Sequence, residues 1–266
     1  MNYKSILFFL GIFSILISLF SLLNIFYSIY FDFIIGLNLY LITFSVSLVL
    51  GFLFYFIGRN HRKSIILTDQ IIFILLSFIL LPLLISIPFN LSIYDMNLLD
   101  SYFESVSGFT TTGFSVINHI DNVDEPLLLW RSSSQWIGGL LFLLATIGTI
   151  GSKQIKIKPA YLISGGASGR NFYNNFNYNF IKILLIYFSS TLLIIFLYTL
   201  FDIRLLDSFN LAFTTISSGG FINSENLTNI LINKTQIFVI ATTLLFPIFN
   251  FFLLHDIITR QFSFRN

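Results

Sequence analysis

The sequence predicts an all-α integral membrane protein, in which two leading transmembrane helices precede two repeats of a helix, a pore loop and a second helix. Three observations carry this prediction. Of the 266 residues, 56% are hydrophobic and only 10% are charged, whereas about a quarter of the residues in a soluble domain are charged. Several segments are long and apolar enough to cross a bilayer. A short segment between two of them recurs later in the chain.

The first region, residues 1–63, is predicted to hold the two leading helices, at about residues 6–29 and 33–57. A signal peptide is the rival interpretation of the first segment. Its apolar run would be about 7–15 residues long and would precede a small-residue cleavage site. The apolar run here is longer and no such site follows, which favours a membrane span.

The second region, residues 64–151, is predicted to be the first repeat. Its spans are expected at about residues 65–87 and 127–150, with Pro82 bending the former near its outer end. Between them lies the segment 101–113, which begins as a short amphipathic stretch and ends in three threonines and a glycine.

This segment indicates a pore loop. A bilayer excludes irregular backbone unless that backbone is buried in protein or lines a water-filled cavity. An ordinary extracellular hairpin is the alternative. Threonines and a glycine suit a row of inward-pointing carbonyls, since that conformation needs a residue without a Cβ atom. The candidate ion-coordinating residues, acting mainly through main-chain oxygens, are Thr110, Thr111, Thr112 and Gly113.

A cytoplasmic linker is expected at residues 152–177, and the second repeat at 178–266, with spans at about 178–201 and 236–258. The glycine-rich part of the linker, 163–169, lacks the spacing and the lysine of a phosphate-binding P-loop. We therefore interpret it as a flexible connection.

The second repeat contains a copy of the pore loop. Residues 207–221 align with residues 100–114, so that Asp207 matches Asp100 and Gly220 matches Gly113. An acidic residue at the start of a short helix can cap free amides and meets the positive end of the helix dipole. Internal duplication of this kind is common among transport proteins. The second set of candidate ion-coordinating residues is Ser217, Ser218, Gly219 and Gly220.

Charge placement supports this layout. With both termini in the cytoplasm, all of the 14 basic residues except Arg131, Arg204 and Lys234 fall on the inner side, as the positive-inside rule expects. Most acidic residues then lie outside. They could concentrate cations at the pore mouth, or they could simply complement the positive-inside bias.

Residues 103–113, together with the stretch Leu-Trp-Arg-Ser-Ser-Ser-Gln-Trp-Ile-Gly-Gly at 129–139, resemble the TrkH-type membrane subunits of the Trk/Ktr/HKT potassium transporter superfamily. Residues 207–221 are similar to that family's second pore loop, and Asn250 falls where the family tends to carry an asparagine. The resemblance implies a potassium-channel-like fold and potassium uptake across the cell (inner) membrane. It also implies potassium as the transported ion, four filter strands and a cytoplasmic nucleotide-binding regulatory partner.

The chain departs from the family pattern in having two repeats instead of four. A ring of coordinating carbonyls needs four strands around one axis. Two copies could pair about a two-fold axis, a separate chain could supply the other half, or the product could be truncated; we favour the latter two. A non-conducting assembly or regulatory subunit is the alternative function. Leu141 stands where the family often has a glycine, which puts a hinge there in doubt.

Several residues have expected supporting roles. We expect Glu104 to brace the loop or to interact with Arg131, because an ionised intramembrane carboxylate is unfavourable unless it is paired. Direct cation binding by Glu104, and snorkelling of Arg131 to the interface, are the lesser alternatives. Trp130 and Trp136 are expected to be interface anchors or packing residues. Gly138 and Gly139 are expected to permit close helix contact.

Other classes of function find little support. The chain has no cysteine, which excludes disulfides and thiolate chemistry. His61, His119 and His255 lack metal-ligand spacing, and no nucleophile or metalloprotease motif is present. We therefore expect a transporter and not an enzyme, with no organic cofactor and no nucleic-acid partner.

Overall fold

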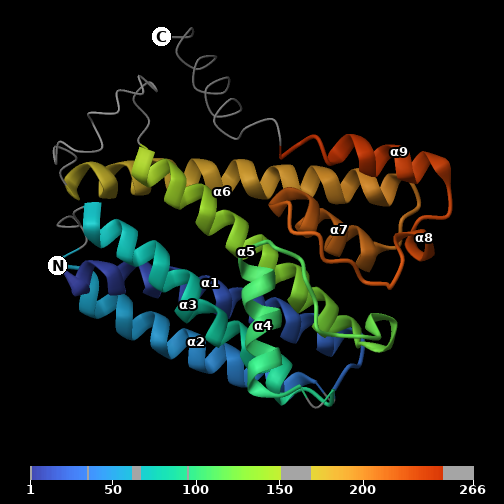
Figure 1. Ribbon diagram of the computed structural model, residues 1–266, viewed down its shortest axis with the longest axis horizontal. Coiled ribbons are helices and arrows are strands. Elements are labelled where there is room, and N and C mark those ends of the chain that lie inside the picture. Colours follow the sequence, from blue (N-terminus) through green and yellow to red (C-terminus); the bar gives the residue numbers. More distant parts are fainter. Residues whose placement is uncertain (1, 35, 62–66, 95, 151–168, 248–266) are drawn as a thin grey trace, which may run out of the picture. The chain divides into compact units, whose positions relative to one another are not determined.

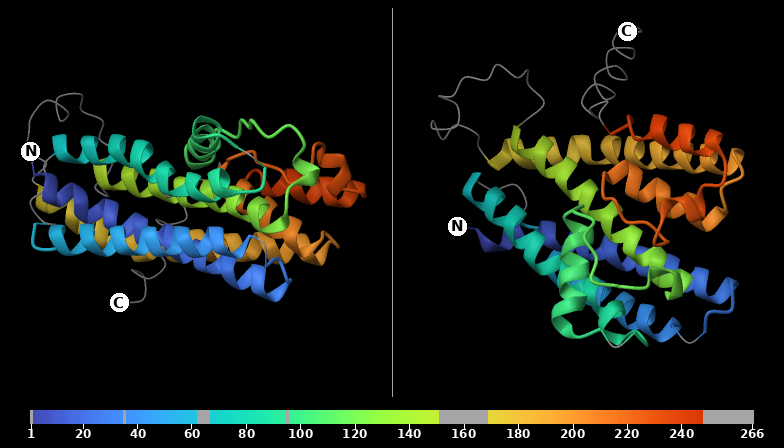
Figure 2. Two further views of the ribbon diagram at one scale, coloured as in Figure 1. Left: turned by 90° about the horizontal axis from the view of Figure 1, so that it is seen from below. Right: turned by 45° about the vertical axis from the view of Figure 1, so that its right-hand side comes forward.

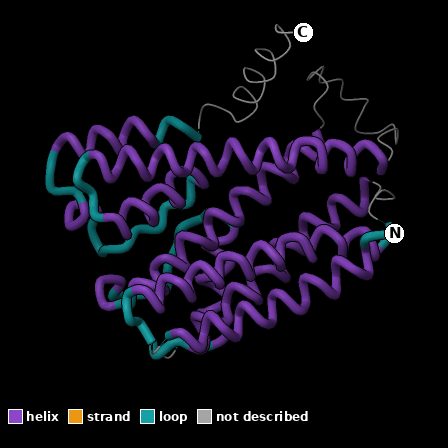
Figure 3. The backbone as a smooth tube through the Cα atoms, turned by 180° about the vertical axis from the view of Figure 1, so that it is seen from behind, coloured by secondary structure: helices purple, strands orange, loops and turns teal. Residues whose placement is uncertain are grey.

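A computed structural model describes residues 2–34, 36–61, 67–94, 96–150 and 169–247, and in these ranges all regular secondary structure is helical (Figures 1 and 3). The all-α class predicted from the sequence is therefore confirmed. The helices are α1 (Tyr3–Tyr30), α2 (Leu37–Gly58), α3 (Leu67–Leu91), α4 (Leu98–Phe109), η1 (Ile120–Asn122), α5 (Glu125–Ile150), α6 (Gly169–Leu200), α7 (Leu205–Ser217), α8 (Leu227–Ile230) and α9 (Lys234–Thr243).

Among the described residues, α1, α2, most of α3 and the second half of α6 are long and apolar enough to cross a membrane. Large apolar side chains such as Phe56 (56% exposed) and Phe196 (64% exposed) lie on their surfaces, where lipid can cover them. In contrast, α5 has a polar run, 131–135, and all five of these side chains are 3% exposed or less. This polar turn of α5 is thus buried in protein on all sides.

The chain forms two compact units. The first comprises Met1–Leu98 and Leu141–Phe180, in which α1, α2 and α3 lie side by side (Figure 2). A Cβ atom on Gly58 would lie 2.4 Å from the carbonyl oxygen of Lys4, so only a glycine allows α1 and α2 to approach this closely. Near the two ends of this seam, Ser5 donates a hydrogen bond to the carbonyl of His61, and Ser21 donates one to that of Tyr40.

The second unit comprises Leu99–Leu140 and Ile181–Asn266. It contains the helices that precede the two predicted filter loops, α7 and all of α4 except Leu98, together with both loops. The long helices α5 and α6 contribute residues to both units, so the units do not follow the predicted repeat boundaries. Those boundaries describe the duplication of the sequence and stay a prediction.

Several predicted boundaries differ from the structure. Helix α6 begins at Gly169, inside the predicted linker, because no glycine or proline interrupts residues 170–200. Helix α9 ends at Thr243 and a turn follows. Pro247 is four residues further on, where its ring would clash with the carbonyl of Thr243 in a continuing helix.

Helix α3 continues through Pro82 and Pro88 to Leu91, past the predicted end of that span. Some expectations lie outside the described residues: those for 152–168, for Asn250 and His255, and for the end of the last span.

Candidate ion-coordination site

The two short helices, α4 and α7, end in the same backbone conformation. After α4, Thr111 has a φ angle of 56° and Gly113 one of 83°; after α7, Ser218 has 57° and Gly220 has 81°. The alignment made from the sequence matches Thr111 with Ser218 and Gly113 with Gly220. The duplication is therefore confirmed at the level of individual backbone angles.

Matching hydrogen bonds produce this conformation. The amide of Thr111 bonds to the carbonyl of Gly108 at 2.9 Å, and that of Thr112 to Ser107 at 2.9 Å. In α7 the equivalent bonds join Ser218 to Thr215 at 3.2 Å and Gly219 to Thr214 at 2.9 Å. Each helix thus ends in a Schellman motif. A left-handed residue with a Cβ atom is unfavourable by about 1–2 kcal/mol, so the surroundings must hold Thr111 and Ser218 in place.

The first filter loop, residues 110–113, and the second filter loop, residues 217–220, lie in contact. A Cβ atom on Gly113 would be 2.3 Å from the carbonyl oxygen of Gly219 and 3.4 Å from the Cα atom of Gly220. Thr112, Ser218 and Gly220 are exposed, and Gly219 is buried. The remaining members, Thr110, Thr111, Gly113 and Ser217, are half-buried.

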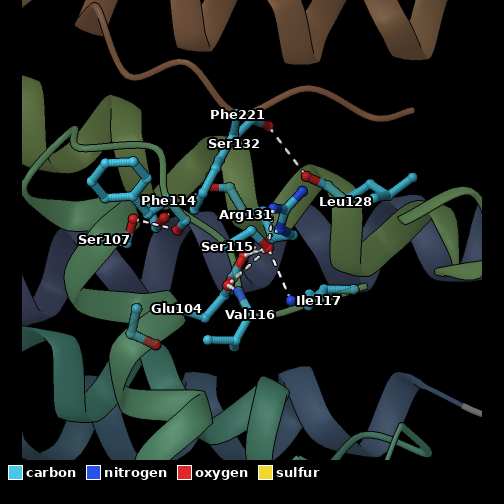
Figure 4. Close-up of polar contacts among 12 residues, drawn as sticks. Glu104, Ser107, Phe114, Ser115, Val116, Ile117, Leu128, Arg131, Ser132 and Phe221 are labelled. Carbon is cyan, nitrogen blue, oxygen red and sulfur yellow. Dashed lines mark hydrogen bonds and ion pairs between the residues drawn. The ribbon is translucent and has the colours of Figure 1, made fainter. Parts of the chain in front are cut away.

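A buried ion pair supports the segment after the first filter loop. The Nε atom of Arg131 donates to Oε1 of Glu104 at 2.8 Å, and the two side chains are 3% and 0% exposed. The same carboxylate accepts hydrogen bonds from the Ser115 hydroxyl and from the Val116 amide, each at 3.1 Å (Figure 4). A buried pair is tolerated when further hydrogen bonds of this kind satisfy it. The predicted interaction of Glu104 with Arg131 and with the loop is confirmed.

Arg131 also reaches the segment after the second filter loop. Its Nη1 donates to the carbonyl of Ile222 at 3.3 Å, and its Nη2 to the hydroxyl of Ser115 at 3.1 Å. The guanidinium carbon lies 4.1 Å from the ring centroid of Phe221, a cation–π contact. One buried arginine of α5 therefore joins the two loop segments (Figure 4).

The glycines of α5 bring it close to the two short helices. A Cβ atom on Gly138 would lie 1.8 Å from the carbonyl oxygen of Phe109, the last residue of α4. A Cβ atom on Gly139 would lie 2.9 Å from Cβ of Ser217, the last residue of α7. The predicted close contact at both glycines is confirmed.

Both tryptophans of α5 are packing residues. Trp130 is 1% exposed and Trp136 is 3% exposed. The indole of Trp136 donates to the Thr191 hydroxyl at 3.0 Å, which ties α5 to α6. Of the two roles expected from the sequence, the structure supports packing.

Gln135 is a site residue that the sequence reasoning missed. Its Nε2 donates to the carbonyl of Gly219 at 2.6 Å, and its Oε1 accepts from the amide of Phe221 at 3.3 Å. The available signal was its spacing: Gln135 follows Arg131 by four residues and so lies on the same face of α5. The side chain is fully buried.

Further polar contacts lie beyond the filter loops. Asp207, in the first turn of α7 as predicted, accepts a hydrogen bond from Asn223 at 3.2 Å. His119 and Glu225 approach to 3.3 Å with side chains 76% and 48% exposed. Their exposure makes this contact weak.

The fold and the site together define a helical membrane protein with two similar pore loops, both of which contact helix α5. No family model matches the sequence. An uncharacterized cation transporter of Methanocaldococcus jannaschii is 30% identical over 190 residues, 67% of this chain and 38% of that protein. The Trk system potassium uptake protein TrkI of Halomonas elongata is 29% identical over 165 residues, 56% of this chain and 30% of TrkI.

The crystal structure of the potassium transporter TrkH from Vibrio parahaemolyticus has a similar fold. Its TM-score is 0.75 at 22% identity, and the match covers 92% of this chain and 50% of that one. The chain thus spans half or less of the length of these relatives. These matches confirm the resemblance to Trk-type potassium transporters that the pore-loop and Trp-Arg-x-x-x-Gln-Trp motifs predicted.

Proposed function

We propose that this protein contributes half of a potassium uptake pore, with the carbonyl oxygens of the two filter loops as ion ligands. The observation that carries the proposal is the contact of Gly113 with Gly219 between loops of matching backbone conformation. Arranged around one axis, such loops would present carbonyl oxygens that replace the hydration shell of an ion. The name of the relative TrkI, a potassium uptake protein, supports potassium as the ion.

The remaining filter strands would come from outside the two repeats. Four strands enclose a potassium filter, and residues 110–113 and 217–220 account for two. A second chain or further residues of a longer protein would supply the others, and a second copy of this chain is the third possibility. A cytoplasmic nucleotide-binding subunit would regulate uptake, as the family resemblance implies.

The proposed location is the cell (inner) membrane, with both termini in the cytoplasm. The four apolar helices support membrane insertion. The basic residues, such as Arg59 at the end of α2, support the orientation through the positive-inside rule. Both filter loops would then open toward the outer face.

The deciding experiment is potassium uptake in a host that lacks its own uptake systems, with the chain expressed alone and with its genomic neighbours. We expect uptake in the second case. Uptake in neither case would favour the alternative function, a non-conducting assembly or regulatory subunit.

Thr112→Asp tests the role of the filter loop in the same assay. The Thr112 side chain is exposed, so an aspartate is compatible with folding, while its charge would trap or block a cation. We expect uptake to be lost with the protein still in the membrane, and Thr112→Ser to retain uptake. Uptake by Thr112→Asp at the level of the unsubstituted protein would refute the assignment of this loop.

A further inference from the structure

The two filter loops match in backbone but differ in the side chains that hold them. In the first loop the hydroxyls of Thr110 and Thr112 are 2.8 Å apart, and that of Thr110 donates to the carbonyl of Val106 at 2.7 Å. Because Thr110 uses its only proton on Val106, Thr112 is the donor to Thr110. The first loop is thereby tied to the end of α4.

The second loop keeps the hydrogen bond from the first loop residue to the preceding helix. Ser217, the counterpart of Thr110, donates to the carbonyl of Phe213 at 2.8 Å. Phe213 is the counterpart of Val106. The hydroxyl–hydroxyl bond is missing, since the position of Thr112 is taken by Gly219, which has no side chain.

Gln135 occupies the space of the missing side chain. A Cβ atom on Gly219 would lie 2.3 Å from Cδ, 2.5 Å from Oε1 and 2.6 Å from Nε2 of Gln135. The φ angle of Gly219 is outside the left-handed region, so steric exclusion by Gln135, and not backbone conformation, explains the glycine. The amide then takes over the bracing, with bonds to the carbonyl of Gly219 and the amide of Phe221.

We propose that Gln135 is a positioning residue that sets the orientation of the Gly219 carbonyl and thereby the ion selectivity of the second filter loop. This rests on the proposed function. Two successive glycines, Gly219 and Gly220, have more accessible conformations than any other pair. Without the amide of Gln135, no side chain in the described part of the chain would hydrogen-bond to the Gly219 carbonyl.

The steric part of the proposal is tested by a double-mutant cycle on the purified full chain in detergent, with the melting temperature as the readout. Gly219→Thr alone should lower the melting temperature strongly or prevent folding. Gly219→Thr combined with Gln135→Ala should recover part of the loss, because the threonine then fills the vacated space and can bond to Ser217. An equal loss from Gly219→Thr in both backgrounds, or no folded protein in either, would overturn the proposal.

The selectivity part is tested by rubidium uptake in competition with sodium, in the host used for the function assay. Gln135→Ala should reduce the preference for rubidium over sodium about tenfold, which corresponds to the free energy of one lost hydrogen bond. The maximal rate of rubidium uptake should be retained. A preference unchanged from that of the unsubstituted protein would overturn the proposal.

Gln236 provides the matched control. It is also a buried glutamine, 3% exposed. Its Oε1 accepts hydrogen bonds from the amides of Ile232 and Asn233, just before α9, and its Nε2 donates to the carbonyl of Phe201, just after α6, at 3.0 Å. Gln236→Ala should lower the melting temperature about as much as Gln135→Ala and leave selectivity unchanged. An equal loss of selectivity in both variants would reduce Gln135 to a general structural role.

The outcomes separate this proposal from the proposed function. If no ion is taken up by the unsubstituted chain, with or without its neighbours, the proposed function fails. The melting-temperature cycle still decides whether the side chain of Gln135 excludes a side chain at position 219.

Discussion

The two filter loops of this protein reach one backbone geometry by different means. The segment after the first loop is held by a buried ion pair, Glu104 with Arg131. The second is held by a neutral amide, Gln135, and by the cation–π contact of Arg131 with Phe221. Duplication has therefore preserved main-chain angles while the side chains that enforce them diverged. A shared backbone requirement relates the two halves, whereas only part of the side-chain contacts is shared, namely the bonds of Thr110 to Val106 and of Ser217 to Phe213.

The largest effect should come from removing the residue that serves both loops. Arg131→Ala leaves the buried carboxylate of Glu104 unpaired, which destabilises a protein by about 3–5 kcal/mol. We expect little folded protein by size-exclusion chromatography in detergent. The matched control is Arg204→Ala, since Arg204 pairs with Glu125 but is 64% exposed; such pairs contribute about 0–1 kcal/mol. Equal behaviour of the two variants would contradict the bracing role of Arg131.

The next test compares the glycines that end the two loops. Gly113→Ala and Gly220→Ala both place a Cβ atom at a positive φ angle, which is unfavourable by about 1–2 kcal/mol. Only Gly113 also faces a close neighbour, the carbonyl oxygen of Gly219, whereas nothing lies within 4 Å of a Cβ atom on Gly220. Gly113→Ala should therefore lower the melting temperature more. The reverse order would show that the loops are not packed as described.

A smaller effect is expected from the hydroxyl pair that is specific to the first loop. Thr112→Val keeps the side-chain shape but removes the hydrogen bond to Thr110, a loss of about 0.5–1.5 kcal/mol. The melting temperature should fall slightly, and the amides of the second loop should keep their hydrogen-exchange protection. Faster hydrogen exchange at the amide of Phe221 would mean that the Thr110–Thr112 pair and the Gln135 hydrogen bonds are coupled.

The smallest effect should come from the exposed contact between the segments beyond the loops. His119→Ala removes the interaction with Glu225. Because the two side chains are 76% and 48% exposed, we expect the free energy of unfolding to change by less than about 1 kcal/mol. A melting temperature within error of that of the unsubstituted protein is the expected result. A large decrease would reveal that this contact, and not Arg131 alone, joins the two segments.

Much of the fold could be predicted because its signals are local. Apolar segments of sufficient length specify membrane helices wherever they occur, and α1, α2 and α3 lie where hydropathy predicted them. The boundaries at Gly169 and Thr243 were less predictable, because hydropathy marks the bilayer and not the end of a helix. The pairing of Glu104 with Arg131 could be expected, since each is an ionisable residue in an apolar environment.

The sequence by itself determined the membrane class, the duplication and the positions of the two filter loops, because an alignment of 100–114 with 207–221 needs no knowledge of contacts. Only the tertiary structure decided what holds those loops. Gln135 meets Gly219 across 84 residues of chain, and Arg131 meets Ile222 across 91. A neutral glutamine in a helix has many possible partners, so its partner becomes known only when helix packing brings one buried carbonyl within reach.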